Sequence, residues 1–261
     1  MARFRAGASF HPQHTTMAGL RAGWREAEAI GADSVWAWDH FFPLYGDRDG
    51  AHFEGWSLLA AIACDTARVR FGALVTCNSY RNPDLLADMA RTVDHLSGGR
   101  LYLGIGAGWF ERDYQEYGYD FGTAAWRLAQ LEAALPRIES RMAKLDPPPV
   151  QGKVPILIGG GGEKVTLRLV AEHADAWNGF GPPEEYARKS AILTEWCERV
   201  GRDPSTVERT VLIDDDEVDR WEEFLEAGAT HLIVGLGFDR DSAEAFDLAP
   251  LRRLLTHRDG R

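Results

Sequence analysis

Short apolar runs alternate along the chain with stretches in which apolar residues recur at helical spacing. The runs are rich in β-branched and aromatic residues and cover 4–10, 33–39, 69–77, 101–106, 155–160, 174–180, 207–213 and 231–236. The stretches with helical spacing cover 18–31, 55–67, 83–97, 124–145, 163–173, 184–200, 217–227 and 248–257. A strand followed by a helix, repeated from one end to the other, predicts parallel strands joined by right-handed crossovers.

The number of these units favours an α/β fold, a (β/α)8 TIM barrel that forms a single domain over residues 1–261. Eight units in roughly 250 residues is the usual size of such a barrel. The alternative is a doubly wound open sheet, which usually has fewer units and a dinucleotide fingerprint after its first strand. No such fingerprint follows the first apolar run. The Pro-rich segment 146–155 is interpreted as a helix-to-strand connection within the domain, because proline stops a helix.

Composition narrows the class of partner. The chain has 29 Lys and Arg against 40 Asp and Glu, a net charge of −11, which argues against nucleic acid and anionic membranes. Its three cysteines are too few for a disulfide framework or a zinc site. It has no apolar run of the roughly 18 residues that a membrane span needs, and no signal-peptide run at its start. We expect a cytoplasmic protein with a small-molecule substrate and no metal.

Residues that could take part in binding or catalysis gather where the predicted strands end. In a barrel, the carboxyl ends of the strands carry the active site. The second to eighth strands end, in order, at Asp39-His40, Thr76-Cys77-Asn78, Gly106-Ala107-Gly108, 159–162, Asn178-Gly179, 214–216 and 235–237. The loops at the opposite ends carry mostly Gly, Ala and Pro turns. The sequence therefore predicts one site at the carboxyl ends of the strands.

Two glycine-rich turns have different interpretations. In GGGGEK (159–164), a strand leads into a helix, so backbone N–H groups and the helix dipole predict a phosphate cradle, with Lys164 as a point charge. The alternative is a tight turn, and no Gly-Lys-Ser/Thr closes it as in a Walker A loop. GIGAG (104–108) is half of a dinucleotide fingerprint and predicts close backbone approach to a flat ligand, the alternative being a loop bulge.

His40 is the candidate catalytic residue. An imidazole at the end of a strand can act as a general acid or base, while the alternative is a structural pair of Asp39 and His40 that caps the loop. His11 and His14 follow the first strand, and two histidines without carboxylate support make a poor zinc site.

Three segments carry a resemblance to a known family. Residues 28–44, 68–118 and 154–178 together resemble the bacterial luciferase-like monooxygenases, in particular their branch of coenzyme F420 (deazaflavin)-dependent oxidoreductases. The middle segment is the most specific, because YRNP, LSGGR and GIGAGW occur in register. The resemblance runs from about residue 4 to about residue 240 and implies a (β/α)8 barrel with the flavin or deazaflavin ring across the carboxyl ends of the strands.

The resemblance assigns positions around that ring. Asp39 and His40 would lie beside it, and Thr76 and Asn78 near its polar edge. A bulge on the third strand would carry a non-prolyl cis peptide between Ala73 and Leu74. The remaining positions border the ring and ribityl chain or hold the phosphate: Gly106, Ala107, Gly108, Gly159, Gly160 and Gly161. We add Asn178, at the end of the sixth strand, to the cofactor-binding set, and we expect the homodimer that is common in the family.

Two departures from the family pattern affect the chemistry. Sugar-phosphate and alcohol dehydrogenases of the branch have a Trp and a Glu at the positions of Leu44 and Trp109. We therefore expect His40 to lack its usual companions and to act alone or with a water, Tyr45 or Tyr80. The connection 124–155 is shorter than the insertion in luciferase subunits, which predicts a more open mouth.

The resulting hypothesis is an F420-dependent oxidoreductase that transfers hydride between the cofactor and a small organic substrate. One alternative is an FMN-dependent monooxygenase that receives reduced flavin from a separate reductase. Others are a non-catalytic flavin-binding homologue and a phosphate-binding lyase or isomerase without flavin. The acidic tail of F420 needs basic residues near the phosphate, and Arg81, Arg112 and Lys164 are the candidates.

Overall fold

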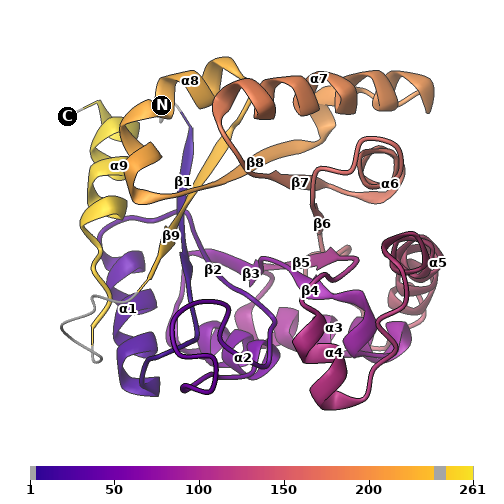
Figure 1. Cartoon of the computed structure of the whole chain (residues 1–261), viewed down its shortest axis with the longest axis horizontal. Helices are drawn as coiled ribbons and strands as arrows, with labels where there is room; N and C mark the ends of the chain where they lie inside the picture. Colours follow the sequence, from indigo (N-terminus) through magenta and orange to yellow (C-terminus); the bar gives the residue numbers. More distant parts are fainter. Residues whose placement is uncertain (1–3, 238–244, 261) are drawn as a thin grey trace.

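The barrel predicted from the sequence is present and closed. The computed structural model describes residues 4–237 and 245–260. Its parallel β segments pair in the order β3-β2-β1-β9-β8-β7-β6-β5-β4, and β3 also pairs with β5, which closes the sheet. They are β1 (Arg5–Phe10), β2 (Ser34–Ala37), β3 (Arg70–Ala73), β4 (Thr76–Cys77), β5 (Leu101–Gly106), β6 (Ile156–Gly159), β7 (Ala176–Gly179), β8 (Glu208–Ile213) and β9 (His231–Leu236). The helices surround these strands (Figure 1).

The third strand of the barrel is interrupted. The run predicted as one strand over 69–77 forms β3 and β4 instead, with a break at residues 74 and 75. The predicted cis peptide between Ala73 and Leu74 was wrong by one residue, since the cis bond joins Leu74 and Val75. The reason is in the ladder: the Leu74 N–H still donates to the carbonyl of Ala37 on β2 at 2.8 Å, so the regular pairing continues through Leu74.

The eight predicted helices are confirmed, and one α-helix of the described residues was missed. The helices are α1 (Met17–Ala29), α2 (Gly55–Asp65), α3 (Pro83–Ser97), α4 (Glu111–Tyr117), α5 (Ala124–Met142), α6 (Thr166–His173), α7 (Pro183–Arg199), α8 (Trp221–Glu226) and α9 (Ala249–Asp259). The missed one is α4, whose 7 residues are too few to show a helical repeat. In the ranges that the structure describes, no helix is long and apolar enough to cross a membrane.

Alternation along each strand separates two apolar cores. Trp36, Leu157 and Ile233 point into the barrel, where they form a small interior cluster with Tyr102 and Ala176. The residues on either side of Leu157 and Ile233 belong to the larger core between barrel and helices. Because side chains on a strand point alternately to opposite faces, the barrel interior is filled rather than hollow.

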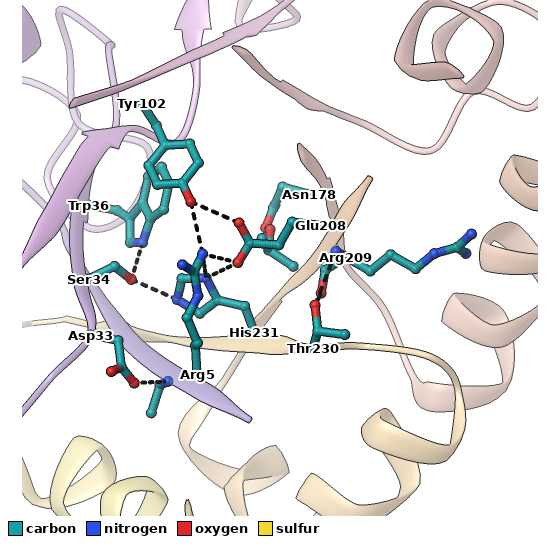
Figure 2. Close-up of polar contacts among 12 residues, drawn as sticks. Arg5, Asp33, Ser34, Trp36, Tyr102, Asn178, Glu208, Arg209, Thr230 and His231 are labelled. Atoms are coloured by element: carbon teal, nitrogen blue, oxygen red, sulfur yellow. Dashed lines mark hydrogen bonds and ion pairs between the residues drawn. The ribbon is translucent and has the colours of Figure 1, made fainter. Parts of the chain in front are cut away.

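A polar network closes the amino-terminal end of the barrel around Glu208, at the start of β8 (Figure 2). Its carboxylate accepts from Tyr102 at 2.9 Å and from His231 Nδ1 at 3.0 Å, and it forms an ion pair with Arg5. Arg5 also donates to the Tyr102 hydroxyl at 2.9 Å. These partners lower the pKa of Glu208 to about 2, against the burial that would raise it.

The network continues from His231 into the barrel. Trp36 Nε1 donates to Ser34 Oγ at 2.7 Å, and Ser34 Oγ lies 2.7 Å from His231 Nε2 (Figure 2). Ser34 therefore donates to Nε2, and the ring carries its proton on Nδ1, where Glu208 accepts it. A second proton on Nε2 would displace the hydrogen that Ser34 donates there. Burial is the main cause of the lowered pKa of the fully buried His231.

The substitution Glu208→Gln should destabilise the fold by roughly 3 kcal/mol at neutral pH, since it removes the charge that Arg5 and Tyr102 face. Because folding lowers the carboxyl pKa from 4.5 to about 2, this stability is complete above pH 4.5 and is lost as the pH falls toward 2. His231 adds a loss of the same sign, starting below its ordinary value of 6.5. Urea unfolding at several pH values measures both effects. Glu195→Gln, in an exposed ion pair with Arg199, is the matched control and should change stability by less than about 0.5 kcal/mol.

Candidate active site at the carboxyl ends of the strands

Val75 forms the floor of the barrel mouth. At the break in the third strand, Leu74 and Val75 are half-buried and pack on the interior cluster. A Cβ at Gly106 would lie 2.8 Å from a Val75 methyl, and one at Gly159 would lie 2.9 Å from the other. Both contacts are closer than real Cβ atoms allow. These two predicted cofactor-binding glycines therefore make room for Val75, which leaves an apolar, partly exposed surface at the centre of the mouth.

His40 lies at the edge of this mouth and is held by Asp113. Its Nδ1 is 2.7 Å from Asp113 Oδ2, and both side chains are almost fully buried. Asp113 also accepts from the Phe41 N–H at 3.1 Å and from the Tyr80 hydroxyl at 2.7 Å. Because its other partners donate to it, Asp113 accepts from His40 as well, which places the imidazole proton on Nδ1. Among the described residues, Nε2 of His40 has no hydrogen-bond partner.

The expectation that His40 lacks an acidic and an aromatic companion was wrong. Asp113 comes from α4, four residues after Trp109, so the acid stands at a different sequence position from the Glu of the family pattern. Trp109 itself packs edge-on against the imidazole, with ring centres 5.7 Å apart. Tyr80, one of the predicted partners, acts on His40 through Asp113. Burial raises the pKa of Tyr80 far above its usual range, so its hydroxyl remains a donor.

Aromatic rings without charge surround His40 on the side of β1 and β2. Trp38 packs edge-on against His40 at 6.1 Å and stacks on His11 at 4.3 Å. Its indole N–H donates to His52 Nε2 at 2.9 Å. Burial lowers the pKa of His11 and of His52 to about 4, so both are neutral at pH 7. Together with exposed Tyr45, these uncharged rings line one side of the space around His40.

Asp39 forms a structural ion pair with Arg81. Its two carboxylate oxygens accept from Arg81 at 2.6 and 3.0 Å, and Arg81 also pairs with Glu54 at 2.6 Å. Burial raises the pKa of Asp39, and the facing guanidinium opposes that shift. The bidentate pair fixes the end of β2 against the segment that follows β4. The predicted role of Asp39 beside a ring stays a prediction.

The two predicted polar residues that follow the break differ in their partners. Thr76 is fully buried, and its Oγ1 accepts from Trp56 Nε1 at 2.9 Å. Asn78 is 7% exposed, and its Oδ1 is a buried acceptor that has no partner among the residues described. Such an atom is costly unless a ligand donates to it. A flavin or deazaflavin ring carries an N–H on its pyrimidine edge, so Asn78 fits a cofactor of this type. Ala73, by contrast, is buried in the larger core between barrel and helices.

The glycine loop after β6 has both engaged and free N–H groups. The Gly160 N–H donates to the Asn178 carbonyl at 3.1 Å, while the Gly160 carbonyl accepts from Trp177 Nε1 at 2.8 Å. The Asn178 amide oxygen accepts from Thr210 at 2.7 Å. In the described part of the chain, the N–H groups of Gly161 and Gly162 donate to no acceptor. These two groups, rather than Gly160, are available to a phosphate.

The turn after β5 has a structural explanation. Gly108 has φ +83°, and a Cβ there would overlap the Tyr114 hydroxyl. Its carbonyl accepts from Arg127 Nε at 3.0 Å, and the half-buried Ala107 places its carbonyl 3.4 Å from the same Tyr114 hydroxyl. The small residues at the end of GIGAG therefore let Tyr114 of α4 pack closely against this turn. Whether Ala107 and Gly108 also border a cofactor stays a prediction.

Two of the three basic residues expected to meet an acidic tail are occupied. Arg81 is held by Asp39 and Glu54, and Arg112 pairs with Asp49 and covers the ring of Phe42 at 4.2 Å. Lys164 is exposed. Sequence reasoning missed Lys189, which stands beside Gly161 although it is 28 residues away in the chain. It also missed Asp113, whose only signal was an acidic helix turn after the glycines at the end of β5. No group of three or more His, Cys, Asp or Glu in the described ranges could hold a metal ion.

Comparison with known proteins identifies the family of this barrel. The family model described as luciferase-like monooxygenase matches residues 1–253. The chain is 30% identical over 302 aligned positions to a phthiodiolone/phenolphthiodiolone dimycocerosates ketoreductase of Mycobacterium sp. (strain JLS), covering 100% of this chain and 76% of the relative.

Two solved structures share the fold. An F420-dependent secondary alcohol dehydrogenase, in complex with an F420-acetone adduct, matches with a TM-score of 0.79 at 19% identity, over 89% of this chain and 93% of that one. The coenzyme F420-dependent tetrahydromethanopterin reductase of Methanopyrus kandleri matches with a TM-score of 0.76 at 15% identity, over 98% of each chain. The chain is thus a (β/α)8 barrel that belongs to the luciferase-like monooxygenase family.

Proposed function

We propose that the protein is an F420-dependent oxidoreductase that transfers hydride between the deazaflavin and a small carbonyl compound or the corresponding alcohol. The observation that carries the proposal is His40, whose Nδ1 is fixed by Asp113 at 2.7 Å while its Nε2 stays free at the edge of an apolar floor. The ketoreductase relative and the F420-dependent neighbours support the same reaction class. An intact pair of His40 and Asp113 also disfavours a non-catalytic homologue.

Different residues of the mouth would hold the cofactor and transfer the proton. When bound, a reduced deazaflavin supplies the hydride. Leu74 and Val75 would support one face of the planar group, and Asn78 Oδ1 would accept from its N–H edge. His40 donates a proton from Nε2 to the carbonyl oxygen, and Asp113 stabilises the imidazolium that delivers it. The buried Trp38 packs edge-on against the imidazole and excludes water on that side.

The second candidate is a monooxygenase that uses FMN reduced by a separate enzyme. The description of the matching family model favours it. The two functions differ in what they need at the phosphate end, because FMN lacks the acidic tail of F420. With Arg81 and Arg112 engaged in ion pairs, an F420 tail would extend toward Lys164 and Lys189.

Titration of the purified protein with F420 and with FMN tests the choice of cofactor. The chain has 9 tryptophans, and Trp177 donates to the Gly160 carbonyl, so quenching of indole fluorescence should report binding. We expect a micromolar or lower Kd for F420 and at least tenfold weaker binding of FMN. Micromolar binding of FMN without binding of F420 would instead establish the monooxygenase.

The substitution His40→Asn should lower turnover by about 10²–10⁴-fold, the usual effect of losing a general acid. Turnover can be measured as oxidation of reduced F420 by a panel of uncharged ketones. Cofactor affinity and the unfolding midpoint should change little. A variant that loses cofactor together with activity would make His40 a ring-holding or structural residue, and unaltered turnover would place the proton donor elsewhere.

The substitution Asp113→Asn should lower turnover at least tenfold. The amide can donate to Nδ1, which reverses the imidazole tautomer, and the imidazolium loses its carboxylate. Cofactor affinity should change less than turnover does. Asp49→Asn, on the exposed partner of Arg112, is the control and should leave turnover in place. A fall in turnover no larger than the fall in cofactor affinity would limit Asp113 to a structural role.

A further inference from the structure

Lys189 holds an ammonium group against the glycine loop. It lies on α7, and a Cβ built at Gly161 would overlap its Nζ, with Cδ at 2.9 Å and Cε at 3.1 Å. The lysine side chain therefore extends along Gly161, next to a backbone N–H that donates to no acceptor in the described ranges. A cation and a free N–H donor thus meet at one point of the loop.

Helix α7 is fastened to this loop on both sides of that point. Arg188 pairs with the Glu163 carboxylate at 2.7 Å, and Trp196 Nε1 donates to the Glu163 carbonyl at 2.8 Å. These bonds fix the distance between the helix and the loop. The contacts of Arg188 and Trp196 with Glu163 therefore hold the backbone of Lys189 close to Gly161.

The hydrogen-bonding capacity of Lys189 is incompletely used. Its side chain is 17% exposed, and the ammonium has three N–H donors. Among the described residues its one anionic partner is Glu185, which lies 3.2 Å away in the next turn of the helix. The neighbouring Phe180 ring lies 6.0 Å from Nζ. A largely buried cation with spare donors favours a second anion.

We infer that Lys189 is the residue that binds the phosphate of the cofactor, together with the N–H groups of Gly161 and Gly162. The inference rests on the proposed function, because it concerns the phosphate end of the same flavin or deazaflavin. It replaces the sequence expectation for Lys164, which is exposed. Lys189 contributes charge, and the glycine N–H groups contribute directed donors, the two elements of a phosphate site.

The inference predicts for which compounds Lys189 increases the binding affinity. FMN and the 5′-phosphate of the 5-deazaflavin riboside carry a phosphate on the ribityl chain and no acidic tail, whereas riboflavin and the 5-deazaflavin riboside have the same rings without the phosphate. Lys189 should therefore increase affinity only for the phosphorylated member of each pair. The comparison does not require knowledge of the substrate, and it can be made with whichever ring the protein binds.

The experiment measures Kd by fluorescence quenching for the four compounds with the wild type, Lys189→Met and Lys164→Met. Methionine keeps the length and helix propensity of the lysine stem while removing the charge. We expect Lys189→Met to weaken the phosphorylated compound at least tenfold and its unphosphorylated partner less than twofold. Lys164→Met, the control on the same loop, should change neither by more than twofold, because these compounds lack the acidic tail that Lys164 would meet. Thermal unfolding of each variant without ligand checks that the fold is intact.

The following outcomes would overturn the inference. Equal weakening of both members of a pair would mean that Lys189 shapes the ring site or the loop. Unchanged affinity of all compounds, or an effect of Lys164→Met instead, would place the phosphate elsewhere. If the wild type binds none of the four compounds, the proposed function fails and the inference fails with it, whereas a Lys189→Met variant that keeps the wild-type preference for the phosphorylated compound removes the inference alone.

Discussion

The active end of this barrel depends on the packing of Val75 against two neighbouring strands. Because the third strand is interrupted after Leu74, the Val75 side chain turns inward and occupies the space that side chains at Gly106 and Gly159 would fill. The ends of β5 and β6 thereby pack against the same apolar side chain. Any Cβ at these glycines would have to displace Val75, so the glycines, the break and the position of Val75 form one constraint.

Around this floor, the polar residues separate into those that hold the scaffold and those with unused capacity. Asp39, Thr76 and Asn178 have partners within the chain. By contrast, Asn78 Oδ1 is a buried acceptor without a partner among the described residues, and none of them bonds to His40 Nε2. Leaving a buried acceptor such as Asn78 Oδ1 unpaired costs stability, and a fold retains it where a ligand completes it. The unused groups are therefore a better guide to the chemistry than the glycines that fit the family pattern.

The sequence predicts the fold far better than it predicts the site. Alternation of short apolar runs and helical stretches is a local property, so the barrel and the boundaries of β9 follow from it directly. The same reasoning places His40 at a strand end. It misses Asp113, because the contact spans 73 residues and the helix that carries the acid has only 7. It misses Lys189 for the same reason, since only the packing of α7 on the loop brings the lysine to Gly161. A family pattern read at fixed positions also misleads here, because the acid beside His40 comes from a different position of the loop.

The two ends of the barrel use buried polar groups in opposite ways. At the amino-terminal end, the chain from Trp36 through Ser34 and His231 to Glu208 is closed, with each donor matched to an acceptor. Such a network fixes the tautomer of its histidine and leaves nothing for a ligand to complete. At the carboxyl end, Asp113 fixes the tautomer of His40 in the same way, but the second ring nitrogen is left free. The chemical difference between a structural and a reactive histidine in this protein is thus one hydrogen bond: Ser34 occupies Nε2 of His231, and among the described residues nothing occupies Nε2 of His40.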